Sequence, residues 1–298
     1  MKMQFLKTTL GLFALCLVFQ GAIAQDLVTS TGPESPLTLA TFTSTPHGYA
    51  VTSTIIYGKK DLLLIDPQLL LSEAGHVVDI IKGTGRKLTT IYSTHAHPDH
   101  FLGVAAVLKA FPDAKYVALP EVRERIVTAW PARRNFWFPT YGDDLPSEVA
   151  ILPEALTKPV LTLEGYEMPI TREQIGLDGP GNSFVHIPAI DAVVAGDIIF
   201  SSHLRPPADS VPLYATLDRI AALHPKIVVA GHQAKGTAND PQVLNFIREY
   251  IGAFKMARLI STTPAELQEK MLKLYPGLGR EDALEQAAQQ AFKPAAAK

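Results

Sequence analysis

The chain of 298 residues is long enough for one large domain, or for a domain with an appendage, and it can bury an ample core. Its 27 basic and 29 acidic residues nearly balance, and no run of lysine or arginine occurs, which argues against nucleic acid as the main partner. The sequence contains one cysteine, Cys16, so an intramolecular disulfide is excluded.

The first 24 residues have the pattern of a secretory signal peptide. A basic start precedes an apolar stretch at 10–19, and Ala22 and Ala24 place small residues at the two positions that a signal peptidase reads. The apolar stretch is shorter than the roughly 20 residues of a membrane-spanning helix. We therefore expect cleavage before Gln25 and a periplasmic or secreted protein without a stable membrane anchor; a retained anchor is the alternative.

Removal of this segment changes the charge and the available chemistry. It takes away two of the 27 basic residues and none of the 29 acidic ones, which leaves a net charge of −4. It also takes away Cys16, so the mature chain has no thiolate to act as a nucleophile or as a metal ligand. Any metal is then held by imidazole and carboxylate groups.

Apolar and β-branched runs alternate with segments of helical spacing through the rest of the chain. In chain order we expect strands at 37–43, 51–57 and 61–65, a helix at 72–82, a strand at 88–92, a helix at 101–111, a strand at 116–119, a helix at 121–130, strands at 160–163, 184–187 and 192–195, a helix at 213–223, a strand at 226–230, and helices at 241–254 and within 263–292. Strands that first form hairpins and then alternate with helices predict an α/β fold, with helices outside the sheets.

Residues 131–159 form the least regular part of this pattern. Prolines and the aromatic run Phe136-Trp137-Phe138 predict a loop or lid there rather than a framework element. As part of a lid, Trp137 is a candidate substrate-binding residue. In the alternative interpretation, the aromatic side chains anchor a long loop to the core.

The segment STHAHPDH at 93–100 follows the expected strand 88–92 and contains three of the nine histidines. Strand side chains alternate, so His95 and His97 point to the same side if the extended backbone continues. Pro98 ends the strand, and Asp99 and His100 stand where the next helix begins. The segment therefore aims four candidate metal ligands at one point, although Asp99 is also a candidate helix cap.

One segment does not close the coordination shells of two ions, so distant ligands are required. Asp197 follows the expected strand 192–195 in VVAGDIIF, and His232 follows the strand 226–230 in KIVVAGHQ. In both, a glycine directly precedes the candidate ligand and allows a close approach of the backbone to the site.

HAHPDH, AGD and AGH, each after an apolar strand, together resemble the metallo-β-lactamase superfamily of metal-dependent hydrolases. The resemblance covers about 38–257 and implies a four-layer αββα sandwich, with metals at one edge between two sheets. We expect this domain to span 25–260 and a helical C-terminal extension to span 261–298. The resemblance implies the following ligand roles: His95 and His97 on the first metal, Asp99, His100 and His232 on the second, and Asp197 as the bridge.

The sequence departs from the family pattern at one position. The family supplies a third histidine to the first metal in a turn before the AGD strand, and this turn contains none here. Counting back from the strand that ends in HIP, at 186–188, places Asp178 or Leu177 at the position, depending on one gap. His186 is the nearest histidine, and we interpret it as a strand residue or else a displaced ligand. A carboxylate from Asp178 would complete the shell, whereas Leu177 would leave the first metal weakly bound.

The resemblance implies hydrolysis of a small-molecule substrate that carries an ester, lactone, lactam or similar carbonyl group. Zinc is the expected metal, as one or two ions, and iron or manganese would accept the same ligands. Asp99 is the expected catalytic residue, which holds the attacking water and moves its proton. His203 is a further candidate substrate-binding residue at the pocket rim. The alternative is a single-metal or non-catalytic relative that acts as a binding protein; the sequence leaves the oligomeric state open.

Overall fold

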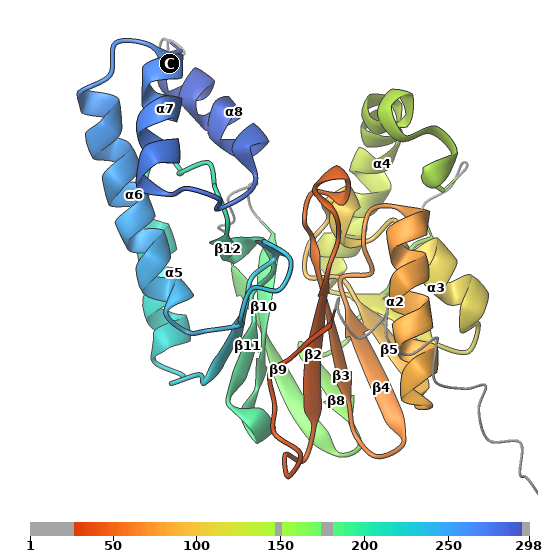
Figure 1. Ribbon diagram of the computed structural model, residues 1–298. Coiled ribbons are helices and arrows are strands. Elements are labelled where there is room, and N and C mark those ends of the chain that lie inside the picture. Colours follow the sequence, from red (N-terminus) through yellow and green to blue (C-terminus); the bar gives the residue numbers. More distant parts are fainter. Residues whose placement is uncertain (1–26, 147–150, 174–180, 294–298) are drawn as a thin grey trace, which may run out of the picture.

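The computed structural model describes residues 27–146, 151–173 and 181–293 of the chain (Figure 1). The expected signal peptide at 1–24 lies outside the described residues, as do Leu177 and Asp178. Within the described ranges, no helix is both long enough and apolar enough to cross a membrane.

The first sheet has seven strands that lie in the order of the sequence. They are β1 (Leu27–Thr29), β2 (Thr38–Thr43), β3 (Thr52–Tyr57), β4 (Asp61–Ile65), β5 (Lys87–Tyr92), β6 (Lys115–Ala118) and β7 (Glu154–Ala155). Strands β1 to β4 pair antiparallel, whereas β4 to β7 run parallel. Parallel neighbours need a crossover connection, and helices follow β4, β5 and β6 to supply it.

The second sheet has the strand order β13-β11-β10-β9-β8. Its strands are β8 (Val160–Leu163), β9 (Tyr166–Glu173), β10 (Asn182–Ile187), β11 (Ala192–Val194) and β13 (Ile227–Val229), and the short strands β12 (Phe200–Ser201) and β14 (His232–Gln233) form a separate pair. Strands β11 and β13 are parallel neighbours, as are β12 and β14. The chain segments after β11 and β13 therefore meet at the same edge of the sheet.

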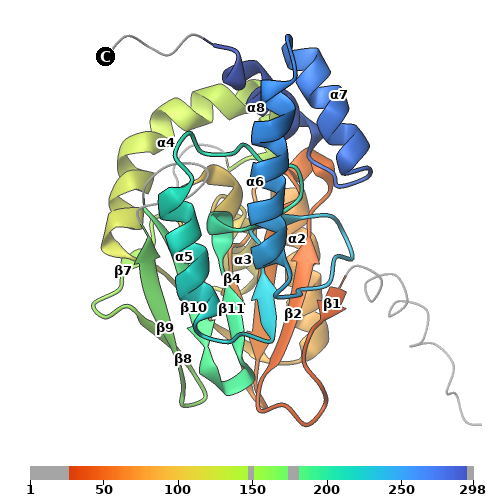
Figure 2. The ribbon, with the colours of Figure 1, turned by 90° about the vertical axis from the view of Figure 1, so that its left-hand side faces the viewer.

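The two sheets face each other, and helices cover both outer faces (Figures 1 and 2). The helices on the first sheet are α2 (Leu71–Thr84), α3 (Val104–Ala110) and α4 (Pro120–Tyr141), and those on the second are α5 (Val211–Ala221) and α6 (Val243–Leu259). This arrangement confirms the expected αββα sandwich.

The strand β11 explains how the sequence builds two buried layers. Ala192 and Val194 belong to the apolar core shared with the first sheet, whereas Val193 and Ala195 belong to the core under the helices. Because strand side chains alternate between faces, a strand buried on both sides requires an unbroken apolar run. The segment AVVA has this pattern.

Of the C-terminal helices, α7 (Pro264–Leu274) packs against α6, and α8 (Glu281–Ala291) packs against α7. Their apolar residues Leu267, Met271 and Leu284 are buried in the same core as α6. Thr263 caps α7 by accepting a hydrogen bond from the Glu266 amide at 3.2 Å. The extension therefore shares its core with the sandwich.

Helix α4 corrects the prediction for the aromatic segment. Residues 131–141 continue the helix that begins at Pro120, so the aromatic run is helical rather than part of a loop. Trp137 and Tyr141 are one turn apart on this helix, and their rings stack with centroids 5.8 Å apart. The Trp137 ring also contacts the ring of Tyr49, outside the helix, with centroids 4.9 Å apart. Proline predicts a break from local sequence alone, whereas tertiary contacts of this kind can override local propensity.

Candidate metal centre

The segment 93–100 is fixed between the two sheets by buried hydroxyl groups. The Tyr92 hydroxyl lies 2.7 Å from Ser183 Oγ, and Ser183 Oγ donates a hydrogen bond to the Thr94 carbonyl at 2.7 Å. After His97, the backbone forms a single 3-10 turn at Pro98–His100, and the expected helix begins only at Val104. His95 and His100 are therefore buried at the end of β5.

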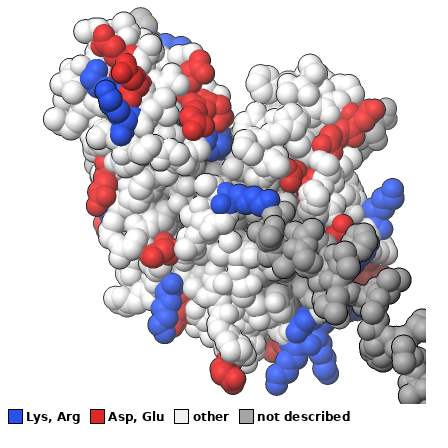
Figure 3. Space-filling view, in the orientation of Figure 1, with Lys and Arg blue, Asp and Glu red and all other residues white. Residues whose placement is uncertain are grey.

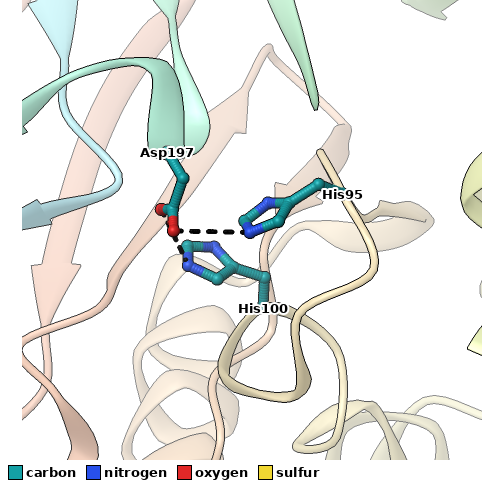
Figure 4. A group of neighbouring side chains, drawn as sticks. All are labelled: His95, His100 and Asp197. Carbon is teal, nitrogen blue, oxygen red and sulfur yellow. Dashed lines mark ion pairs between the residues drawn. The ribbon is translucent and has the colours of Figure 1, made fainter. Parts of the chain in front are cut away.

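Asp197 lies at the centre of the cluster, in a turn directly after β11 (Figure 4). Its carboxylate oxygens lie 3.4 Å from His95 Nε2, 3.0 Å from His100 Nε2 and 3.3 Å from His232 Nε2. Asp197 and His100 are fully buried. Segments that follow two strands of the second sheet and one strand of the first thus contribute to a single group.

A second group of side chains adjoins the first. Asp99 Oδ2 lies 3.5 Å from His232 Nε2 and 3.6 Å from His100 Nε2. The two imidazole nitrogens lie 3.3 Å apart, although the residues are 132 positions apart in the chain. The His97 ring lies 5.2 Å from the His95 ring, and its side chain is 24% exposed. All six expected ligands therefore lie in one cluster.

Two glycines give the backbone room to converge here. Gly196 has φ +48°, and a Cβ on it would lie 2.6 Å from Thr94 Oγ1. A Cβ on Gly231 would collide with the Asp197 carboxylate and lie 2.6 Å from the Gly196 carbonyl carbon. Each glycine thus precedes a clustered residue at a place that no other residue fits without displacement.

Asp66, directly after β4, is a site residue that sequence reasoning missed. Its carboxylate accepts hydrogen bonds from the Thr94 amide and hydroxyl, both at 2.8 Å, and lies 2.9 Å from His100 Nδ1. A carboxylate accepts, so Nδ1 of His100 carries a proton and its Nε2 faces the cluster. The available signal was an acidic residue at the end of an unbroken apolar strand.

The Tyr49 carbonyl orients His232 in the same way. It lies 2.8 Å from His232 Nδ1, and a carbonyl only accepts. When the His232 proton is on Nδ1 and is donated to this carbonyl, the Nε2 lone pair faces Asp197. Backbone groups leave no residue-type signal in a sequence, so this partner was not predictable from composition or spacing.

Charge and burial shift the acid–base behaviour of the cluster. Burial by itself lowers the pKa of His100, but the neighbouring carboxylates of Asp197, Asp66 and Asp99 outweigh it and hold the pKa well above its ordinary value. Burial by itself raises the pKa of Asp99 and of Asp197, but the surrounding imidazoles hold both below the ordinary range, Asp197 furthest. Asp197 is therefore a carboxylate, and a positive charge belongs among the imidazoles.

The donor atoms fit a divalent cation. His95 Nε2, Asp99 Oδ1 and both carboxylate oxygens of Asp197 are buried without a hydrogen-bond partner in the described part of the chain. Two groups, His95 with His100 and Asp197, and Asp99 with His100 and His232, each have ligand atoms within 4.8 Å of one another. Inward lone pairs of imidazole and carboxylate repel unless a proton or cation lies between them, and these are the ligands that zinc accepts.

Two further candidates have other surroundings. His186 is a residue of β10, next to its last residue and opposite Val193, and it is half buried, as the strand interpretation expects. His203 is fully buried, with Nδ1 3.0 Å from the Tyr250 hydroxyl, so its side chain is not at a pocket rim as expected. Its position after an apolar turn gave no indication of this burial.

Trp137, on α4, packs against Tyr49. The surface is hollowed between α4 and the C-terminal helices (Figure 3). The Trp137 ring lies 4.9 Å from the ring of Tyr49, whose carbonyl contacts His232. Phe136, in contrast, is 75% exposed.

The sequence matches the model of one protein family, described as the metallo-beta-lactamase superfamily, over residues 48–232. The matched range contains all six clustered residues as well as Asp66. Among curated proteins, the comparison finds no sequence match.

Three solved structures have a similar fold. A metallo-beta-lactamase from Pontibacter korlensis is 16% identical, with a TM-score of 0.54 and coverage of 76% of this chain and 99% of that one. The DIM-1 metallo-beta-lactamase is 17% identical, with a TM-score of 0.52 and coverage of 75% and 95%. A stereoselective inverting sec-alkylsulfatase from Pseudomonas sp. is 17% identical, with a TM-score of 0.56 and coverage of 87% of this chain and 50% of that one.

Proposed function

The chain belongs to the metallo-β-lactamase superfamily, and we propose that it is an exported metal-dependent hydrolase of small molecules with an ester, lactone, lactam or similar carbonyl group. One observation carries the proposal: three chain segments bring buried imidazole nitrogens and carboxylate oxygens to one point, and several of these atoms have no hydrogen-bond partner among the described residues. Atoms buried in this way destabilise a fold unless they serve a ligand. Export rests on the N-terminal sequence pattern.

The side chains have distinct proposed roles. A bound divalent cation, zinc by ligand type, supplies an acidified water and polarises the substrate oxygen. His95, His97 and Asp197 would hold one ion, and Asp99, His100 and His232 would hold a second beside Asp197. Asp99 also orients the attacking water and moves its proton, for which its unpartnered Oδ1 is available.

A single-metal form is the second candidate. Asp99, His100 and His232 supply three protein ligands to the second site. The first site lacks the third histidine of the family pattern, and Asp178, its proposed substitute, lies outside the described residues. A single ion would then sit at the better furnished site, and a protein without turnover would act as a binding protein.

Metal analysis and a substrate panel test the proposal on the chain from Gln25 onward. The panel contains chromogenic lactam, lactone and aryl ester substrates, and an alkyl sulfate ester because one similar structure is described as an alkylsulfatase. Nearly two ions per chain with hydrolysis that a chelator abolishes supports the two-metal enzyme, and one ion with turnover supports the single-metal form. A chain that binds no metal and hydrolyses nothing in the panel refutes the proposed catalysis.

Asp197→Ala tests the central ligand. Removal of an outer partner alone weakens a metal site about 10- to 100-fold, so loss of Asp197 should lower activity by more than about 100-fold and metal content with it. Asp218→Ala is the matched control, because Asp218 is an aspartate of α5 that pairs with Arg248 at 2.6 Å on the surface. Unchanged metal content and activity in Asp197→Ala would refute the assigned role.

A further inference from the structure

The connection between α7 and α8 has an unusual backbone that directs one arginine inward. Gly277, Gly279 and Arg280 all have positive φ, at 70°, 78° and 59°. The left-handed conformation is free for glycine but costs about 1 kcal/mol or more for arginine. The His203 amide donates a hydrogen bond to the Gly279 carbonyl at 3.1 Å, which anchors the connection to the sandwich. Arg280 is consequently held with only 12% of its side chain exposed.

The Arg280 guanidinium lies beside one residue of the metal cluster, His232, and beside the carbonyl that contacts it. Its Nη1 donates to the Tyr49 carbonyl at 3.2 Å and lies 2.9 Å from His232 Nδ1. Its Nε and Nη2 donate to the two Asp282 carboxylate oxygens at 3.1 and 3.3 Å, and its Cζ lies 5.3 Å from the Tyr49 ring centre. The charge of Arg280 is therefore matched by Asp282, and its donors are engaged within the protein.

Hydrogen-bond chemistry decides what Arg280 does for His232. If His232 binds an ion through Nε2, its proton is on Nδ1, and that N–H donates to the Tyr49 carbonyl. Arginine also only donates, so its Nη1–H must use the second lone pair of the same carbonyl. A single carbonyl oxygen thus connects the C-terminal extension to a metal ligand.

The backbone at the Tyr49 carbonyl is strained, so hydrogen bonds from neighbouring groups are required to hold the carbonyl in place. Tyr49 and Ala50 both have positive φ, at 65° and 54°, and neither is glycine. The Gln233 amide holds the Ala50 carbonyl at 3.2 Å, so the strained pair is fixed on one side by the segment that carries His232. Arg280 fixes it on the other side.

We propose that Arg280 is a positioning residue that fixes the Tyr49 carbonyl and, through it, the ring of His232, so that the C-terminal extension forms part of the metal centre. This inference rests on the proposed metal-dependent function. The contact with Asp282 and the burial of the side chain distinguish this role from direct binding of an anionic substrate.

A chelator competition with Co²⁺ tests the proposal in the chain from Gln25 onward. Arg280→Gly removes the side chain while leaving a residue suited to φ 59°, and it should weaken Co²⁺ binding about tenfold or more. Arg258→Ala is the matched control: Arg258 also attaches α8, by donating to the Ala291 carbonyl at 3.0 Å and covering the Phe292 ring. The control should leave Co²⁺ affinity within about twofold of the parent chain.

The visible absorption spectrum of bound Co²⁺ separates positioning from loss of packing. In Arg280→Gly the ligand-field bands should change because the His232 ring is less constrained, and Arg280→Lys, which retains a donor for Tyr49, should restore them in part. If Arg280→Gly binds Co²⁺ with the parent affinity and spectrum, or if Arg258→Ala weakens binding equally, the inference is refuted. If the parent chain itself binds no Co²⁺, the proposed function fails first.

Discussion

The two ends of the sandwich join the same two sheets in different ways. At one end, the Glu164 carboxylate in the β8–β9 turn accepts the amides of Lys59, Lys60 and Asp61 in the β3–β4 turn at 3.0, 2.6 and 2.8 Å. We call this contact the Glu164 clasp. At the other end, the Asp197 carboxylate lies close to three imidazoles, and neither of its oxygens has a hydrogen-bond partner in the described part of the chain.

The two carboxylates differ in whether the protein itself satisfies them. A carboxylate that accepts backbone amides is satisfied by the protein itself, and it needs nothing from outside. A buried carboxylate surrounded by inward lone pairs costs free energy in the folded chain until a cation or protons neutralise it. Both carboxylates join the two sheets, but only Asp197 needs a cation or protons from the solvent to neutralise it.

The sharpest test of this contrast is Asp66→Asn, which should weaken metal binding about 10- to 100-fold. The asparagine oxygen can still accept the Thr94 amide, but its NH2 group would face His100 Nδ1. Two donors then meet, so the proton of His100 moves to Nε2, where the ion would bind. Competition with a chelator of known affinity measures the loss.

The matched control for that change is Asp144→Asn. Asp144 likewise accepts a backbone amide and a hydroxyl, both from Ser72 at the start of α2, at 2.8 and 2.6 Å. Its replacement should leave metal affinity unchanged. Equal losses in the two variants would mean that Asp66 acts through general stability and not through His100.

A pH titration compares the two ends directly. The raised pKa of His100 means that a proton competes with the ion, so metal affinity should fall as the pH falls, by up to about tenfold per pH unit for each displaced proton. The pKa of Glu164 is lowered by the amides of Asp61, Lys60 and Lys59, so the stability that the clasp contributes persists until the pH falls through that lowered value. Metal release should therefore precede acid destabilisation, as metal analysis and thermal unfolding at each pH would reveal; the opposite order would contradict the contrast.

The smallest expected effect belongs to Glu164→Gln. The glutamine oxygen can still accept the Lys60 and Asp61 amides, but the charge is lost and the NH2 group would face the Lys59 amide. At this exposed turn the midpoint of thermal unfolding should fall slightly, while metal content stays the same. Glu167→Gln, an exposed glutamate of the neighbouring strand, is the control. A loss of metal in Glu164→Gln would show that the two ends are coupled.

The sequence predicted the parts of the centre that depend on residue type and local spacing. His95 and Asp99 stand in one short segment, and Asp197 and His232 each follow a glycine at the end of an apolar strand. Each of these signals lies within a few residues of sequence. The parallel pairing of β11 with β13 then brings Asp197 and His232 together. The αββα arrangement came from the family resemblance and not from periodicity.

Features that depend on tertiary contact were not predictable in this way. The helical conformation of 131–141 depends on ring packing against Tyr49, and β9 alternates exposed and buried residues around a proline, Pro169, that suggests a break. The orientation of His232 depends on a backbone carbonyl, and the place of Arg280 depends on how the extension packs. No local pattern encodes contacts of these kinds.

The position of the cluster between the sheets has a mechanical consequence. Asp99 and His100 follow β5 of the first sheet, whereas Asp197 and His232 follow strands of the second. An ion shared among them would cross-link the two halves of a chain whose described part has no cysteine, much as a disulfide would. Unlike a disulfide, this cross-link would be reversible, so the rigidity of the sandwich would follow the free metal concentration of its surroundings.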